Sequence, residues 1–165
     1  YIPPQKGSGH VWRVIKEIFT HTPQHTGTDI SKAVGFLGRV CRKRSVAFVV
    51  SDFLLPQGGA VVDRSMRAVG RKHELIQVRI SDPGEFVLPA AGIVTVRDLE
   101  NGRWVRLDAG HGRTRRLYAE QRAAAHQAVA DQFKAAGMDC VEISTATSAA
   151  GALTRYFRYR ERRKR

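Results

Sequence analysis

Two short apolar runs with a helical segment between them constrain the fold of this chain most strongly. Residues 46–50 have the length and β-branched content of a buried strand in a parallel sheet. Residues 75–80 form a second apolar run, which we expect to be a strand as well. The segment between them is long enough for a right-handed crossover through a helix, which we expect near residues 60–71. The sequence therefore predicts an α/β fold with a mainly parallel sheet flanked by helices.

The rest of the chain adds elements on both sides of this unit. Apolar residues recur at helical spacing before it and after it, and one further apolar run has the character of a parallel strand. The predicted helices cover residues 11–19, 30–41 and 114–136, and the further strand covers residues 141–144. Gly137 is expected to end the long helix in a left-handed conformation.

Between the second strand and the long helix, the pattern changes to that of a hairpin. Two apolar runs flank Asn101-Gly102, a dipeptide that favours tight turns between antiparallel strands. We therefore expect a small β-hairpin insertion at about residues 92–108. A basic helix at about residues 149–165 completes the chain, and residues 1–165 are interpreted as a single domain.

Composition indicates a globular protein. The 165 residues and 42% hydrophobic content suffice for a domain with a core. No apolar run approaches the roughly 18 residues needed to span a membrane, and no signal peptide is visible. Because the chain begins with Tyr1, we expect a C-terminal portion of a longer protein, whose upstream part could carry a membrane anchor. Cys41 and Cys140 each lie in an apolar pattern and are expected to be buried, reduced thiols, which favours a cytoplasmic location.

The chain is strongly basic, with a formal net charge of +13. Much of this charge lies at the end of the chain, in Arg155, Arg158, Arg160, Arg162, Arg163, Lys164 and Arg165. This basic patch is compatible with nucleic acid, an anionic membrane surface or an acidic protein as partner. Tyr156, Phe157 and Tyr159 interleave with the arginines and could stack on bases, but at this spacing they also form one apolar helical face. We favour packing for these rings.

Two oxygen-bearing side chains are candidate ligands of a divalent cation. Ligands of an open α/β sheet bind beyond the carboxyl ends of its strands, where Asp52 follows the run 46–50, and Thr28 lies just before the next helix. A carboxylate and a hydroxyl are hard donors that suit Mg²⁺ or Mn²⁺. Ser51 and Asp29 are candidates for supporting hydrogen bonds. The alternatives are that Thr28 and Asp29 cap a helix and that Asp52 begins a turn.

No catalytic residue is predicted. The sequence has no Walker lysine, dinucleotide-binding glycine pattern or nucleophile elbow, and the acidic residues outside the candidate site do not pair as an acid–base couple. The histidines are scattered, and none is assigned a chemical role.

A series of short motifs extends over nearly the whole chain in a characteristic order. They are Pro3-Pro4, Gly9-His10-Val11, Gly27-Thr28-Asp29-Ile30 with Ala33, Arg44-Ser45, Ser51-Asp52-Phe53, Arg71-Lys72-His73-Glu74, Asp82-Pro83, Leu88-Pro89, Arg116-Leu117-Tyr118 and the arginine-rich end. In this order the chain resembles the C-terminal portion of a bacterial domain-of-unknown-function family, the von Willebrand factor A-like proteins associated with MoxR-type AAA+ ATPases.

The resemblance implies a von Willebrand factor A-like, Rossmann-like fold that is incomplete at its N-terminus. It also implies a metal-ion-dependent adhesion site, whose ligands come from three loops at the carboxyl edge of the sheet. Thr28 then corresponds to the threonine of the second loop and Asp52 to the aspartate of the third. The Asp-x-Ser-x-Ser motif of the first loop is absent and is expected upstream of Tyr1. Mg²⁺ or Mn²⁺ is expected only where that loop is present.

Three hypotheses for the function follow. The first is a non-enzymatic protein-interaction module, divalent-cation-dependent when the site is complete and an accessory or adaptor to a MoxR-type ATPase. The second is binding of nucleic acid or an anionic surface through the basic C-terminal helix. The third, ranked last, is a Mg²⁺-dependent hydrolase centred on Asp52. If the chain is expressed alone, the strand at residues 46–50 lacks a neighbour, and self-association through that sheet edge or marginal stability is expected.

Overall fold

The computed structural model of the chain describes residues 1–23, 28–54, 60–97 and 102–163. In chain order the elements are α1 (Ser8–Thr20), α2 (Ile30–Val40), β1 (Val46–Ser51), α3 (Arg64–Lys72), β2 (Glu74–Ser81), the short 3-10 helix η2 (Pro83–Phe86), β3 (Ile93–Arg97), β4 (Trp104–Asp108), α4 (Gly112–Ala135), β5 (Asp139–Ser144) and α5 (Ala149–Arg163). No helix in these ranges is long and apolar enough to cross a membrane.

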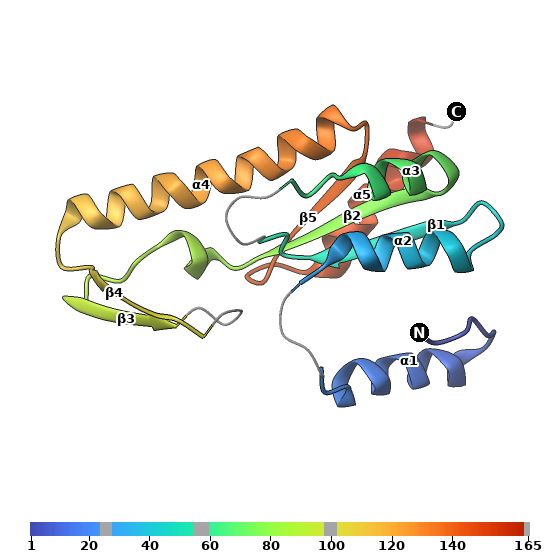
Figure 1. The fold of residues 1–165 in the computed structure, drawn as a ribbon, viewed down its shortest axis with the longest axis horizontal. Helices are drawn as coiled ribbons and strands as arrows, with labels where there is room; N and C mark the ends of the chain where they lie inside the picture. Colours follow the sequence, from blue (N-terminus) through green and yellow to red (C-terminus); the bar gives the residue numbers. More distant parts are fainter. Residues whose placement is uncertain (24–27, 55–59, 98–101, 164–165) are drawn as a thin grey trace.

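The main sheet of the described residues has three parallel strands in the order β1-β2-β5. Helices flank it on both faces, as the sequence predicts (Figure 1). One face packs against residues of α2, α3 and the last turns of α4, including Val34, Val69 and Phe133. The other face packs against α5 through Ala152 and Leu153. The α/β fold class with a mainly parallel sheet is confirmed.

The strand that is buried on both faces is β2, and the expectation that residues 46–50 form a buried strand is wrong. Residues Leu75 to Arg79 of β2 are all buried, whereas Val46 and Val50 of β1 are 49% and 59% exposed. The physical reason is that α5 covers β2 and β5 more fully than it covers β1. The buried residues that pack with α5 on its face of the sheet come from β2 and β5. On β1, Phe48 meets Phe157 of α5, but Val46 and Val50 stay open to solvent.

The crossover helix begins later than its apolar pattern suggests. It starts at Arg64 because Asp63 caps it, accepting a hydrogen bond from the Met66 N–H at 2.8 Å. Val61 and Val62 precede the helix but are buried in the core. Their N–H groups both donate to Oε1 of one side chain of α4, Gln132, at 2.8 and 3.3 Å.

The end of α4 confirms the expected glycine cap. Gly137 has a φ of +65°, its N–H donates to the Lys134 carbonyl, and the Met138 N–H donates to the Phe133 carbonyl. This pair of bonds is the Schellman arrangement that ends many helices. It turns the chain directly into β5.

The strands β3 and β4 pair antiparallel, with Ile93 opposite Asp108. Figure 1 shows this hairpin beside the first turns of α4, away from the main sheet. The predicted turn residue Asn101 lies outside the described residues, and Gly102 after it has a φ of +70°. Cys41 and Cys140 are both free, and both are half-buried, so the expectation that they are buried is wrong.

Candidate functional site

The three parallel strands all end in a serine followed by a second oxygen-bearing residue. The pairs are Ser51-Asp52 after β1, Ser81-Asp82 after β2 and Ser144-Thr145 after β5. We call this end of the sheet the carboxyl edge. Figure 1 shows the first turn of α2 on the same side of the molecule as these strand ends. The edge therefore gathers hydroxyl and carboxylate oxygens from several segments of the chain.

Asp52 and Ser51 form a tight turn after β1. Asp52 Oδ1 accepts the Leu54 N–H at 3.1 Å and lies 3.4 Å from Ser51 Oγ, which donates to it. Ser51 Oγ in turn accepts the Phe53 N–H at 3.0 Å. Asp52 is exposed, and its second oxygen, Oδ2, has no hydrogen-bond partner among the described residues. Asp52 thus begins a turn and still presents one free oxygen to solvent.

The backbone of this turn is strained and is held by the core. Phe53 has a φ of +55° and is the only non-glycine residue with a positive φ in the described part of the chain. Its side chain is only 1% exposed and packs edge-on against Phe133, with ring centroids 5.0 Å apart. Left-handed conformations are costly for bulky residues and persist where the surroundings impose them. The buried ring therefore fixes the direction in which Asp52 leaves the sheet.

Asp82 lies at the same edge, and the sequence predicts no role for its carboxylate. Its Oδ2 accepts a short hydrogen bond from Thr145 Oγ1, and its Oδ1 accepts the Gly84 N–H at 2.7 Å. These bonds, that of Thr145 first, hold the pKa of Asp82 below its usual value. The same Ser-Asp pair ends both β1 and β2, and this repeat is the sequence signal that could have identified Asp82.

Asp29 serves as the N-cap of α2. Its side chain accepts the Lys32 N–H at 2.9 Å and pairs with Lys32 Nζ at 3.2 Å. The backbone bond from Lys32 is the main cause of the lowered pKa of Asp29. Thr28 precedes this cap and is exposed. The side chain of Asp29 is thus engaged by its own helix, while Thr28 lies at the mouth of the loop, as a ligand from that loop would.

The oxygen donors suit a hard cation in kind but are too few. Mg²⁺ takes about six oxygen ligands, and Thr28 and Asp52 supply two. Over residues 1–23, 28–54, 60–97 and 102–163, no group of three or more His, Cys, Asp or Glu side chains could hold a metal ion.

The aromatic residues of α5 are mostly used in packing. The Tyr156 hydroxyl donates to Asp139 Oδ2 at 2.9 Å, and burial of the ring, with this bond, raises the pKa of Tyr156 to about 12. Phe157 meets Phe48 of β1 edge-on, with centroids 6.1 Å apart. Tyr159 is the most exposed of the three rings, at 58%.

Not every arginine of the predicted basic patch is free on the surface. Arg160 forms an ion pair with Glu74 of β2, and its side chain is only 14% exposed. Arg155, Arg158 and Arg162 are exposed on α5. The side chain of Arg163 and the whole of Lys164 and Arg165 lie outside the described residues.

Comparison with known proteins identifies relatives without an assigned activity. The sequence profile of the family described as "Protein of unknown function DUF58" matches residues 1–129. Uncharacterized proteins of Mycobacterium tuberculosis and Mycobacterium bovis are 31% identical over 103 residues, which is 61% of this chain and 32% of theirs. An uncharacterized protein of Mycobacterium avium is 28% identical over 166 residues, 98% of this chain and 94% of the relative. The chain thus spans about a third of the length of the first two relatives. No solved structure matches it.

Proposed function

The chain belongs to the DUF58 family of proteins of unknown function, and from that premise we propose that it is a non-enzymatic protein-interaction module that binds its partner at the carboxyl edge. The observation that carries this proposal is the arrangement of strand ends. Two adjacent parallel strands end in Ser-Asp and a third ends in Ser-Thr. Such an edge is where open α/β sheets bind their ligands.

We further propose that the fold is von Willebrand factor A-like and that recognition is cation-dependent in the intact protein. Thr28 and Asp52 are then two of the ligands, and the remaining ones come from an Asp-x-Ser-x-Ser loop expected upstream of Tyr1. Mg²⁺ or Mn²⁺ bound by hydroxyls and one carboxylate retains positive charge and attracts a carboxylate of the partner. The unpartnered Oδ2 of Asp52 and the exposure of both residues support this assignment.

The partner we propose is a MoxR-type AAA+ ATPase, for which the chain acts as accessory or adaptor. The test is co-purification of that ATPase, identified by mass spectrometry, with the tagged product of the complete gene. We expect capture in Mg²⁺, loss of capture in EDTA, and loss in the Asp52→Ala variant. Asp131→Ala, which removes an exposed carboxylate of α4, is the matched control and retains capture. Capture that is indifferent to EDTA and to Asp52→Ala contradicts the cation-dependent site, and failure to capture the ATPase contradicts the adaptor role.

A second candidate function is binding of nucleic acid or another anionic surface through α5. The exposed Arg155, Arg158 and Arg162 support it, together with the net charge of +13. It predicts that binding of a single-stranded oligonucleotide weakens steeply with salt. Changing these three arginines to Gln should flatten that salt dependence. No binding at low salt contradicts this candidate.

A Mg²⁺-dependent hydrolase ranks behind both. Such an enzyme needs a second carboxylate to act with Asp52. Asp82 belongs to the same edge, but both of its oxygens are occupied by Thr145 and the Gly84 N–H. Hydrolysis of a phosphodiester or phosphomonoester that is lost in Asp52→Ala would revive this candidate.

A further inference from the structure

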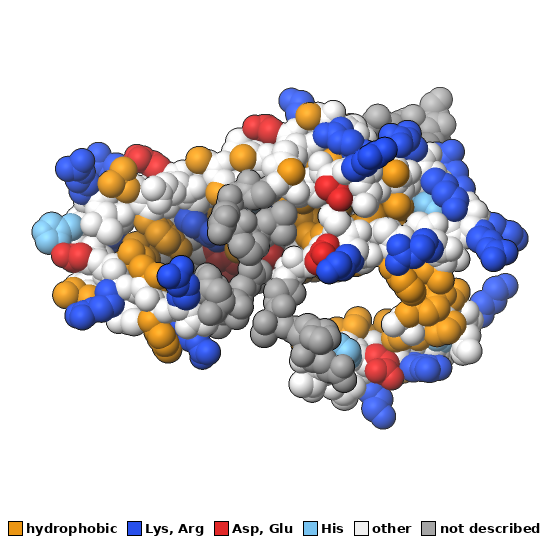
Figure 2. Space-filling view, in the orientation of Figure 1, with side chains coloured by type: hydrophobic (Ala, Val, Ile, Leu, Met, Phe, Trp, Pro, Cys, Tyr) orange, Lys and Arg blue, Asp and Glu red, His pale blue; other side chains and the backbone are white. Residues whose placement is uncertain are grey.

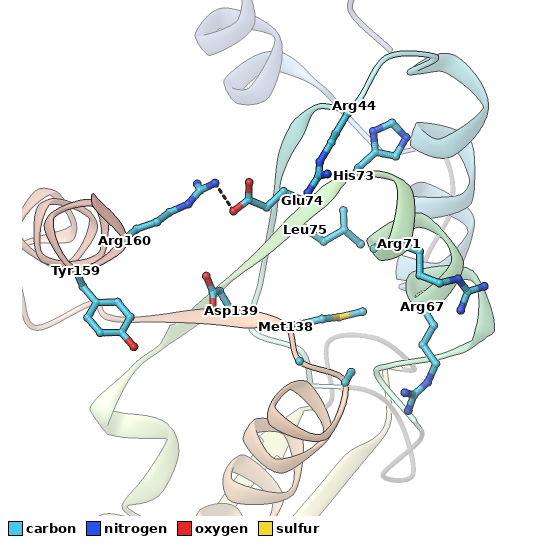
Figure 3. Close-up of a pocket in the computed structure, with 13 residues that line it drawn as sticks. Arg44, Arg67, Arg71, His73, Glu74, Leu75, Met138, Asp139, Tyr159 and Arg160 are labelled. Atoms are coloured by element: carbon cyan, nitrogen blue, oxygen red, sulfur yellow. Dashed lines mark ion pairs between the residues drawn. The ribbon is translucent and has the colours of Figure 1, made fainter. Parts of the chain in front are cut away.

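The opposite end of the sheet contains an open pocket. It has a volume of about 610 Å³ and lies where β2 and β5 begin, between the end of α3, the end of α4 and α5. Figure 3 shows Arg67 and Arg71 on one side of it, Tyr159 and Arg160 on the other, and the strand starts between them. Pockets that hold small ligands have volumes of about 300–1,000 Å³. The pocket is therefore large enough for a small organic ligand.

The two carboxylates that line this pocket are already engaged. Glu74 forms an ion pair with Arg160, another residue of the lining. Asp139 accepts the hydroxyl proton of Tyr156 in a hydrogen bond of 2.9 Å. The acidic part of the lining is thus satisfied from within the molecule.

Three further arginines of the lining, Arg44, Arg67 and Arg71, are exposed. None of them forms an ion pair with a carboxylate in the described part of the chain. The C-terminal ends of α3 and α4 border the pocket, and each contributes about half a negative charge. Asp139 also keeps its charge, because the Tyr156 hydroxyl that donates to it is neutral. The three guanidinium groups outweigh these negative charges together. Figure 2 shows Lys and Arg side chains gathered over this end of the molecule. The pocket therefore attracts anions.

A buried histidine in the pocket wall adds an unsatisfied polar group. His73 is 2% exposed, lines the pocket, and has no partner for either ring nitrogen among the described residues. Buried polar atoms are nearly always hydrogen-bonded in native proteins, and an unpaired one costs free energy. An oxygen of a bound ligand that reached this wall would remove that cost.

We propose that this pocket binds a polyphosphate, either free or as part of a nucleotide. Arginine binds phosphate through paired N–H groups and keeps its charge under all physiological conditions. Arg44 comes from the turn before β1, whereas Arg67 and Arg71 come from α3, so an extended anion reaches more of them than a single phosphate does. This site is distinct from the carboxyl edge, and its existence does not depend on the proposed interaction function.

The test is titration of the chain with pyrophosphate by calorimetry, at low salt and in EDTA so that no cation site takes part. The variant is Arg67→Gln with Arg71→Gln. The matched control is Arg113→Gln with Arg116→Gln, which removes the same charge from exposed positions of α4. We expect a loss of affinity of about tenfold or more in the first variant and less than about twofold in the control. Circular dichroism of both variants checks that the fold is kept.

A parallel titration with ATP distinguishes the two sources of the phosphate. Equal affinities for ATP and pyrophosphate indicate that phosphate alone is recognised, and tighter binding of ATP indicates a nucleotide. The proposal is overturned if pyrophosphate does not bind the unmodified chain. It is also overturned if both double variants weaken binding equally, because the attraction is then a general effect of the net charge.

Discussion

Arg79 in the middle of β2 is held by Glu142 on the neighbouring strand β5. Arg79 Nε donates to Glu142 Oε2 at 3.0 Å, and its Nη2 pairs with Oε1 of the same carboxylate. A third bond joins Arg79 Nη1 to the His126 carbonyl of α4 at 2.6 Å. The guanidinium is only 2% exposed. These bonds tie the central strand, the outer strand and the long helix together around one buried charge.

We predict that Glu142→Gln lowers the free energy of unfolding by about 2 kcal/mol, because it leaves a buried guanidinium without its counter-charge. Urea denaturation of the two proteins measures this difference. Glu120→Gln is the control, since Glu120 is an exposed residue of α4, and it should change stability by less than about 0.5 kcal/mol. An equal effect of both substitutions would show that the pair contributes nothing specific.

His126 makes stability depend on pH near neutrality. Burial, followed by the nearby charge of Arg79, lowers the pKa of His126 below its usual value of 6.5. The unfolded chain therefore binds a proton more readily than the folded chain, and stability falls as the pH drops below about 6.5 towards the folded pKa.

The measurement is the urea midpoint between pH 5.5 and 7.5, a window on both sides of the unfolded pKa of about 6.5. His126→Gln should remove this part of the pH dependence. His111→Gln should retain it, because His111 lies on the exposed surface. A pH profile that is unchanged in His126→Gln contradicts the assignment.

Local pattern predicted most of the secondary structure. The runs 46–50 and 75–80 specify strands through β-branched content, and Gly137 ends α4 because only a residue that tolerates a positive φ fits there. Burial could not be predicted in the same way. Val50 and Val78 are equally apolar, but only Val78 has a helix above it. Whether a helix packs over a strand depends on the tertiary structure, which the residues of that strand do not specify by themselves.

The candidate site was predicted only in part. Asp52 follows its strand directly, so its place at the carboxyl edge could be inferred from the order of elements. The role of Asp82 depends on Thr145, a residue 63 positions away. Likewise Arg79 is an apparent polar interruption of an apolar run, and its partner is equally far along the chain. Long-range polar pairs of this kind leave no periodic signal.

We expect substitution by Ala to have opposite effects on stability at two glycines of α2. A Cβ on Gly38 would come within 2.8 Å of Val69 Cγ2 in the core between α2 and α3, whereas a Cβ on Gly35 would meet only Arg39 Nη1, at 3.9 Å. We expect Gly38→Ala to destabilise the chain by about 1–3 kcal/mol through overpacking. Gly35→Ala should stabilise it by about 0.5–1 kcal/mol through helix propensity. Thermal unfolding measures the change in stability of both variants. If both substitutions stabilise the chain, or both destabilise it, this packing of Gly38 against Val69 is contradicted.

The open face of β1 predicts self-association of this chain. In the described structure β1 pairs with β2 alone, and Val46, Phe48 and Val50 are exposed. Apolar edge strands without charged residues tend to pair with other chains. Light scattering should therefore show a mass that rises with concentration, and Val50→Lys should reduce it.

The matched control for the edge is Ile93→Lys, because Ile93 is an exposed apolar residue of the separate hairpin. This substitution should leave the association unchanged. A monomer at every concentration contradicts association through β1, and so does equal suppression by the two lysine variants.

A cation-dependent carboxyl edge can be tested by titration of the complete gene product with Mn²⁺. The electron paramagnetic resonance signal of the free ion measures how much Mn²⁺ is bound. We expect saturable binding that Asp52→Ala weakens by about tenfold or more, while Asp131→Ala binds like the unmodified protein. Equal Mn²⁺ affinity of the unmodified protein and Asp52→Ala would show that Asp52 does not bind the cation and only begins a turn.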